Sequence, residues 1–106
     1  MNDTDNQKAD NQLNIELDEK TAEGVYANLV MISHSPEEFI LDFIRVMPGV
    51  PTARVKNRVI VTPHHARRLL RALHDNIEKY EAMHGEIEER EQPGQSIRFG
   101  GMAGQA

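Results

Sequence analysis

Four of the five histidines fall between positions 64 and 84, and imidazole is the side chain that most often binds a metal in proteins. His64 and His65 are adjacent, so on a helix they would point about 100° apart and could not share one ion. His74 and His84 lie on different turns, and no zinc-type ligand pattern includes them. Because the chain also has no cysteine, we expect no metal centre and no bound cofactor.

Asp42 is the one acid placed inside an apolar run, and such a carboxylate can act as a general base when a reactive partner is within reach. No histidine or nucleophile stands at a matching spacing, so a solvent-facing or salt-bridged strand residue is the simpler interpretation. The sequence contains no glycine-rich phosphate loop and no nucleophile elbow, and Gly100-Gly101 neither follows a strand nor opens a helix. We therefore expect the protein not to be an enzyme.

Six basic side chains form two sets that could bind phosphate groups or an acidic protein. One set alternates along one face of an expected strand, and the other lies on the outer surface of the helix expected after it. The sets are Arg54, Lys56 and Arg58, and Arg67, Arg68 and Arg71. The simpler interpretation is a solvated strand face and helix face that carry ordinary charge, including protection of a strand edge. Residues 24–84 carry eight bases and six acids, which leaves this segment at +2, so nucleic-acid binding is possible but not favoured.

The composition predicts a single small domain, because 106 residues with 39% hydrophobic content support one modest core and no large buried pocket. Residues 1–11 are polar and acidic and lack apolar periodicity, so we expect them to be disordered. We expect residues 12–87 to fold and residues 88–106 to form a flexible glycine-rich tail. No apolar run suits a signal peptide or a membrane span, so the expected location is the cytoplasm.

A strand that runs directly into a helix gives the clearest local signal in the chain. Thr62 is suited to the N-cap, and Pro63 is suited to the first helical position, where its missing N–H costs nothing. We expect the helix to cover residues 63–84 and to end before Gly85. Its apolar residues recur at spacings of four and three and form one stripe, Ala66, Leu70, Leu73, Ile77 and Tyr80, with Leu69 beside it.

Four strands are expected before this helix, at residues 13–17, 25–34, 39–47 and 53–61. Their short connections favour sequential antiparallel pairing. Residues 36–46 could instead form a helix capped by Ser35, but their density of large apolar side chains favours a strand. The predicted fold class is α+β, an antiparallel meander of about four strands with the long helix packed on one face.

Both faces of the expected second and third strands are apolar, whereas one helix about 10 Å wide can cover only one face of a four-stranded sheet. The other face is then available to another protein or to a second copy of the chain. We assign to this partner-binding face Val30, Ile32, Ile40, Ile44 and Val46. On this interpretation, Ile32→Asp or Ile44→Asp should cost little stability in a single chain.

Several segments also carry a family resemblance, and they are Val25-Tyr26-Ala27-Asn28, His34-Ser35-Pro36-Glu37-Glu38-Phe39, Leu41-Asp42-Phe43, Thr62-Pro63-His64-His65-Ala66-Arg67-Arg68-Leu69-Leu70 and Asn76-Ile77-Glu78-Lys79-Tyr80-Glu81. Together they resemble a small bacterial family classified as domain of unknown function 3467, over about residues 14–87. The resemblance implies a bacterial cytoplasmic protein whose partner works in transcription or translation.

The sequence thus favours a non-enzymatic interaction protein. It would act as a homo-oligomer or as an accessory subunit of a larger bacterial assembly, with RNA polymerase as the partner that the resemblance suggests. One alternative is a holdase-like chaperone similar in outline to SecB, which also combines an antiparallel sheet with helices. Another is a weak nucleic-acid-binding protein that uses the six basic residues.

Overall fold

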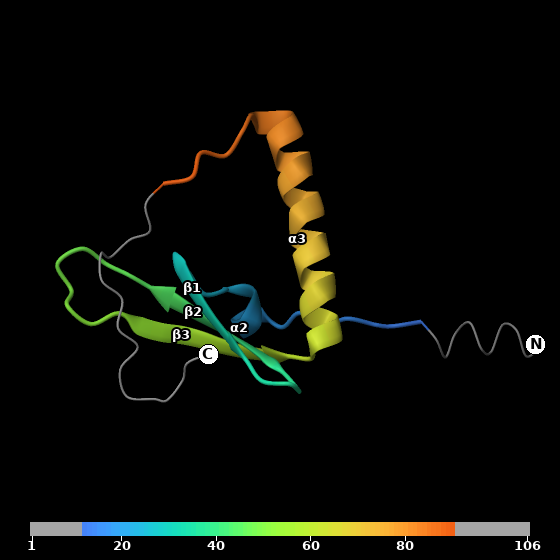
Figure 1. Ribbon diagram of the computed structural model, residues 1–106, viewed down its shortest axis with the longest axis horizontal. Helices are drawn as coiled ribbons and strands as arrows, with labels where there is room; N and C mark the ends of the chain where they lie inside the picture. Colours follow the sequence, from blue (N-terminus) through green and yellow to red (C-terminus); the bar gives the residue numbers. More distant parts are fainter. Residues whose placement is uncertain (1–11, 91–106) are drawn as a thin grey trace, which may run out of the picture.

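The computed structural model describes residues 12–90 and shows an α+β arrangement (Figure 1). In chain order the elements are a short helix α2 (Glu19–Ala22), three strands β1 (Leu29–His34), β2 (Phe39–Arg45) and β3 (Arg54–Val61), and a long helix α3 (Pro63–His84). The predicted fold class is therefore right, but the part of the chain that the structure describes has three strands rather than four.

The three strands pair in chain order, β1 with β2 and β2 with β3, and both pairs are antiparallel. The expected meander is confirmed, and the alternative of a helix at residues 36–46 is wrong. A tight turn joins β1 to β2, in which the Ser35 N–H donates to the Glu38 carbonyl at 2.9 Å and the Ser35 hydroxyl accepts from the Glu37 N–H at 3.2 Å. After β2 the chain turns at Gly49, whose φ of 79° explains a glycine at this position.

The strand expected at residues 13–17 is absent from the structure, and β1 begins at Leu29 rather than at Val25. Alternation of apolar and polar residues marks a suitable strand sequence, but a strand forms only where a neighbouring edge accepts its hydrogen bonds. Asp18 instead caps α2, because its side chain accepts a hydrogen bond from the Thr21 N–H at 2.9 Å. Leu13, Ile15 and Leu17 consequently remain exposed.

Helix α3 begins and ends where the sequence predicts, at Pro63 and His84. The Thr62 hydroxyl accepts a hydrogen bond from the His65 N–H at 3.2 Å, which is the expected N-cap. At the other end, Gly85 has a φ of 94° and donates its N–H to the Glu81 carbonyl at 2.9 Å. Local sequence signals therefore determine both ends of the helix.

The expected packing of this helix across the sheet is wrong. Figure 1 shows α3 projecting away from the strands, from the point where β3 ends. No residue of α3 is buried against any other part of residues 12–90. The amphipathic pattern correctly identifies the apolar side of the helix, but it does not identify what covers that side.

The buried centre of the described chain lies on β2 and consists of Leu41, Asp42 and Ile44. The side chain of Leu41 shares one face of the sheet with Phe43, Val30 and Ile32, and we call this the cavity face. The other face, here called the ion-pair face, carries Asp42 and Ile44 beside Met31 and Arg58. The sheet therefore has a small apolar centre on both sides, with one charge placed within it.

Candidate interaction surfaces

The charge at the centre of the sheet is the carboxylate of Asp42, which is only 2% exposed. Arg58 lies directly opposite on β3, and its Nε and Nη2 atoms donate to the two carboxylate oxygens at 2.7 and 2.8 Å. This bidentate hydrogen bond lowers the pKa of the Asp42 carboxyl and raises the pKa of the Arg58 guanidinium. The salt-bridged interpretation of Asp42 is therefore the right one, and its geometry is that of a structural pair.

The register of β2 and β3 separates the basic residues of β3. Asn57 pairs with Phe43 but Val55 pairs with Ile44, which leaves Lys56 as an extra residue in a β-bulge. The alternation is thereby interrupted, so Arg54 lies on the cavity face, opposite to the face that carries Arg58. The expectation that Arg54, Lys56 and Arg58 share one face is wrong, and Arg58 is already bound to Asp42.

The second basic set is exposed along the first half of α3 and consists of Arg67, Arg68 and Arg71. The second half of the same helix carries Asp75, Glu78 and Glu81 with a single base, Lys79. The surface of α3 therefore changes sign near its middle. A uniformly basic surface for a phosphate backbone is not what this helix presents.

The five residues predicted to form one partner-binding face are divided between the two faces of the sheet. Val30 and Ile32 pair with Phe43 and Leu41 and so lie on the cavity face, whereas Ile40 and Ile44 lie on the ion-pair face. Ile44 is only 5% exposed, so the expectation that Ile44→Asp would be cheap in a single chain is also wrong.

Val46, the fifth residue of the predicted face, lies just beyond β2 and is held by its backbone. The Asn28 side chain accepts from the Val46 N–H at 2.8 Å and donates to the Val46 carbonyl at 3.0 Å. The Asn28 N–H also donates to the Ile44 carbonyl at 3.0 Å, so the asparagine extends the pairing of the sheet beyond β1. This role of Asn28 was not evident from its spacing in the sequence.

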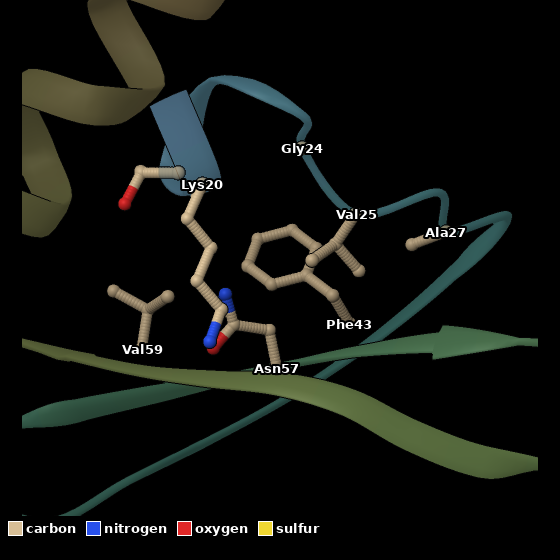
Figure 2. Close-up of a pocket in the computed structure, with 8 residues that line it drawn as sticks. Lys20, Gly24, Val25, Ala27, Phe43, Asn57 and Val59 are labelled. Carbon is tan, nitrogen blue, oxygen red and sulfur yellow. The ribbon is translucent and has the colours of Figure 1, made fainter. Parts of the chain in front are cut away.

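A cavity of about 450 Å³ lies between the cavity face of the sheet and the segment that begins at α2 (Figure 2). Phe43 and Val59 contribute from the sheet, while Val25 contributes from the segment above it. Lys20 and Asn57 add the polar groups of the lining. Because most of these residues are exposed, the cavity is a surface hollow, and the composition had given no reason to expect it.

The apolar stripe of α3 is also exposed to solvent. Leu70, Leu73 and Tyr80 are 61%, 56% and 52% exposed, and Ile77 is also exposed. These residues were assigned to the core from the sequence, so the exposed stripe is a candidate surface that the sequence interpretation missed. The signal that could have identified them is their regular spacing over about four turns of a helix that has only one short sheet to pack on.

His74 lies beside two carboxylates on α3. Its Nδ1 atom is 3.8 Å from an oxygen of Asp75, and its Nε2 atom is 3.9 Å from an oxygen of Glu78. The sequence had shown no zinc-type ligand pattern at this histidine. All three side chains are exposed, so the cluster is an ordinary set of surface charges with weak mutual attraction.

Within residues 12–90, no helix has the length and apolar character needed to cross a membrane. A family model described as "Protein of unknown function (DUF3467)" matches residues 1–89. Neither the curated proteins nor the solved structures provide a match to this chain.

Proposed function

Since the chain belongs to the DUF3467 family, whose description names no activity, we propose from its surfaces that it is a non-enzymatic protein-interaction module that binds through α3. The single observation that supports this function is the exposure of Leu70, Leu73 and Tyr80 along one side of a regular helix. Burial of such side chains is the dominant favourable contribution in most protein–protein association. Contiguous apolar surface of this kind typically marks an interaction site.

The local sequence signals of α3 support the same proposed function. Its N-cap, its first-turn proline and its terminal glycine specify a long helix by local means, without help from the sheet. A helix that is specified locally and is apolar along one side is suited to docking on another protein surface. The sheet, by contrast, satisfies its central charge internally through Asp42 and Arg58.

The cellular setting of this function extends the proposal further. A bacterial cytoplasmic protein that acts as an oligomer or as an accessory subunit, with RNA polymerase as a partner, fits an interaction module of this size. That part of the proposal is supported by the family resemblance, whereas the binding surface is supported by the geometry of α3. The two parts can be tested separately.

The test of the binding surface compares Leu73→Asp with Ala82→Asp in the full chain. Both variants add one carboxylate to α3, but Leu73 belongs to the stripe and Ala82 is exposed on the outer side. We expect Leu73→Asp to abolish self-association or partner capture, because a carboxylate in an apolar interface loses its hydration. Native mass by sedimentation and quantitative capture on immobilised protein provide the two measurements.

The control Ala82→Asp should keep the native mass and the captured partners of the unmodified chain. Circular dichroism should show that both variants retain α3. If Leu73→Asp keeps the native mass and every partner, the stripe is not an interaction surface and the proposed function fails.

A further inference from the structure

The stripe of α3 follows a seven-residue repeat. Leu70, Ile77 and His84 are separated by seven residues each, and so are Ala66, Leu73 and Tyr80. The two series are offset by three and four residues, which is the a and d pattern of a helix that packs along another helix. The apolar part of the pattern covers residues 66–80, which at 1.5 Å per residue is about 21 Å of α3.

The charges on α3 run against the helix dipole. Three arginines and no acid occupy residues 63–74, whereas Asp75, Glu78 and Glu81 follow with one lysine. A helix is stabilised by acids near its N-terminus and by bases near its C-terminus, so this order does not serve the stability of α3 by itself. It does match a helix that runs in the opposite direction, because the basic half of one then meets the acidic half of the other.

We propose that the stripe is occupied by α3 of a second copy of this chain, packed antiparallel. This inference rests on the proposed function and adds the identity of the partner. One alignment of two such helices fills every layer of the seam. Leu73 then packs against Ile77 of the second copy, Leu70 packs against its Tyr80, and Ala66 packs against its His84.

The flanking positions agree with the same alignment. In an antiparallel pair, the e positions of the two helices face each other, and so do the g positions. Arg67 and Glu81 are both e positions, and the alignment places Arg67 of each copy beside Glu81 of the other. On the opposite side, Leu69 faces Met83 of the second copy, and Asn76 faces its own counterpart across the two-fold axis.

Glu81 is half-buried and already accepts a hydrogen bond from the Ile87 N–H at 2.9 Å, through one of its two carboxylate oxygens. That contact orients the carboxylate and leaves acceptor capacity for a guanidinium of a second copy. A parallel pair would instead bring the arginine-rich halves of the two helices together, which is unfavourable.

The first experiment reverses charges at the predicted contact. Arg67→Glu alone places two carboxylates together at both ends of the pair, since Glu81 of the second copy lies beside position 67. Glu81→Arg alone places two guanidinium groups together in the same way. We expect each single change to weaken the dimer roughly 5- to 50-fold in Kd at low salt. The double variant restores both attractive pairs and should recover the dimer, as measured by sedimentation equilibrium over a concentration series.

The matched control is Arg68→Glu, which makes the same charge change one residue further along the helix. Arg68 lies on the outer side, away from the a and d positions, so its reversal should change Kd less than about 2-fold. The effect of Arg67→Glu should also diminish in about 1 M salt, because the Debye length there is about 3 Å.

Mixing the two single variants tests the charge contacts, and thiol cross-linking tests the orientation of the two helices. In an antiparallel pair, a chain with Arg67→Glu and a chain with Glu81→Arg form two attractive contacts, so the mixture should dimerise more tightly than either variant alone. Because the chain has no cysteine, Arg67→Cys and Glu81→Cys can also be linked by a short bifunctional thiol reagent. Antiparallel pairing predicts links between position 67 and position 81, and few links between two copies of position 67.

The outcomes separate this inference from the proposed function. A chain that is monomeric at all concentrations, or a dimer that is indifferent to Arg67→Glu, overturns the antiparallel pair. If Leu73→Asp still abolishes capture of a different protein in that case, the interaction function stands and the stripe has another occupant. Links between two copies of position 67 would replace the antiparallel pair with a parallel one.

Discussion

Strand β2 and helix α3 use apolar side chains in opposite ways. β2 is the central strand, and its Leu41, Asp42 and Ile44 are buried by neighbours within the same chain. α3 carries a longer apolar series, but none of its residues is buried by the rest of residues 12–90. The difference indicates that apolar burial within residues 12–90 is concentrated in the sheet, and it leaves the apolar side of the helix available for the association proposed above.

The largest effect that can test this difference comes from removing matched apolar groups in the two regions. Ile44→Ala should lower the free energy of unfolding by about 2–5 kcal/mol, because Ile44 is enclosed by its neighbours. Leu73→Ala should cost less than about 1 kcal/mol at concentrations where the chain is monomeric, since alanine favours helix and little burial is lost. Urea unfolding of both variants at low concentration provides the measurement.

Equal destabilisation by Ile44→Ala and Leu73→Ala would contradict this difference between β2 and α3, because it would mean that α3 is packed within the single chain. Repeating the Leu73→Ala measurement at high protein concentration then tests whether Leu73 is buried in an assembly. A cost that grows with protein concentration assigns the burial of Leu73 to an assembly.

A smaller effect is expected from the ion pair on β2. Asp42→Ala removes the partner of Arg58, but the Arg58 side chain is 41% exposed and can be rehydrated. The cost should therefore be about 1–3 kcal/mol rather than that of a fully buried unpaired charge. Asp42→Leu combined with Arg58→Leu should cost less than Asp42→Ala alone, which chemical unfolding can measure.

The same pair predicts a dependence of stability on pH. Arg58 lowers the pKa of Asp42 below its ordinary value of 3.8 in the folded chain, so the unfolded chain binds more protons in that range. The stabilisation by Asp42 is present above pH 3.8 and is lost as the pH falls through the lower, folded pKa. Unfolding curves from about pH 6 to about pH 2 should show this loss, and Asp42→Asn should remove the contribution of this residue.

The smallest expected effect concerns the N-cap of α3. Thr62→Ala removes the acceptor of the His65 N–H and should cost about 1 kcal/mol of helix stability. Because α3 does not pack on the sheet, the loss should appear as fraying of its first turn in hydrogen exchange, while protection of the β2 amides stays unchanged. Equal loss of protection in both regions would show that the helix and the sheet unfold as one unit.

How far the fold can be predicted from the sequence differs between these regions for a physical reason. The ends of α3 depend on Thr62, Pro63 and Gly85, which act within a few residues of themselves. The meander follows from short connections, which are also local. The bulge at Lys56, and hence the separation of Arg54 from Arg58, depends on how two strands pair, and neither strand encodes that alone.

The candidate site shows the same limit. Periodicity located the apolar side of α3 correctly, since it depends only on the helical repeat. The sequence interpretation then placed that side on the sheet, which is wrong because no residue of α3 is buried by the rest of residues 12–90. What covers a surface is a property of the assembled molecule, so it is not contained in the pattern of one element.

Thr62 alone separates the last residue of β3 from the first residue of α3. Because the junction is one residue long, the direction in which the stripe faces around the helix axis is closely coupled to the orientation of β3. One residue inserted between Thr62 and Ala66 would rotate the stripe by about 100° and advance it by about 1.5 Å relative to the strands. The angle at which a molecule bound along α3 meets the sheet therefore depends on the φ and ψ of Thr62, which are −73° and 159°, and an insertion at this junction would change that angle without altering a residue of the stripe.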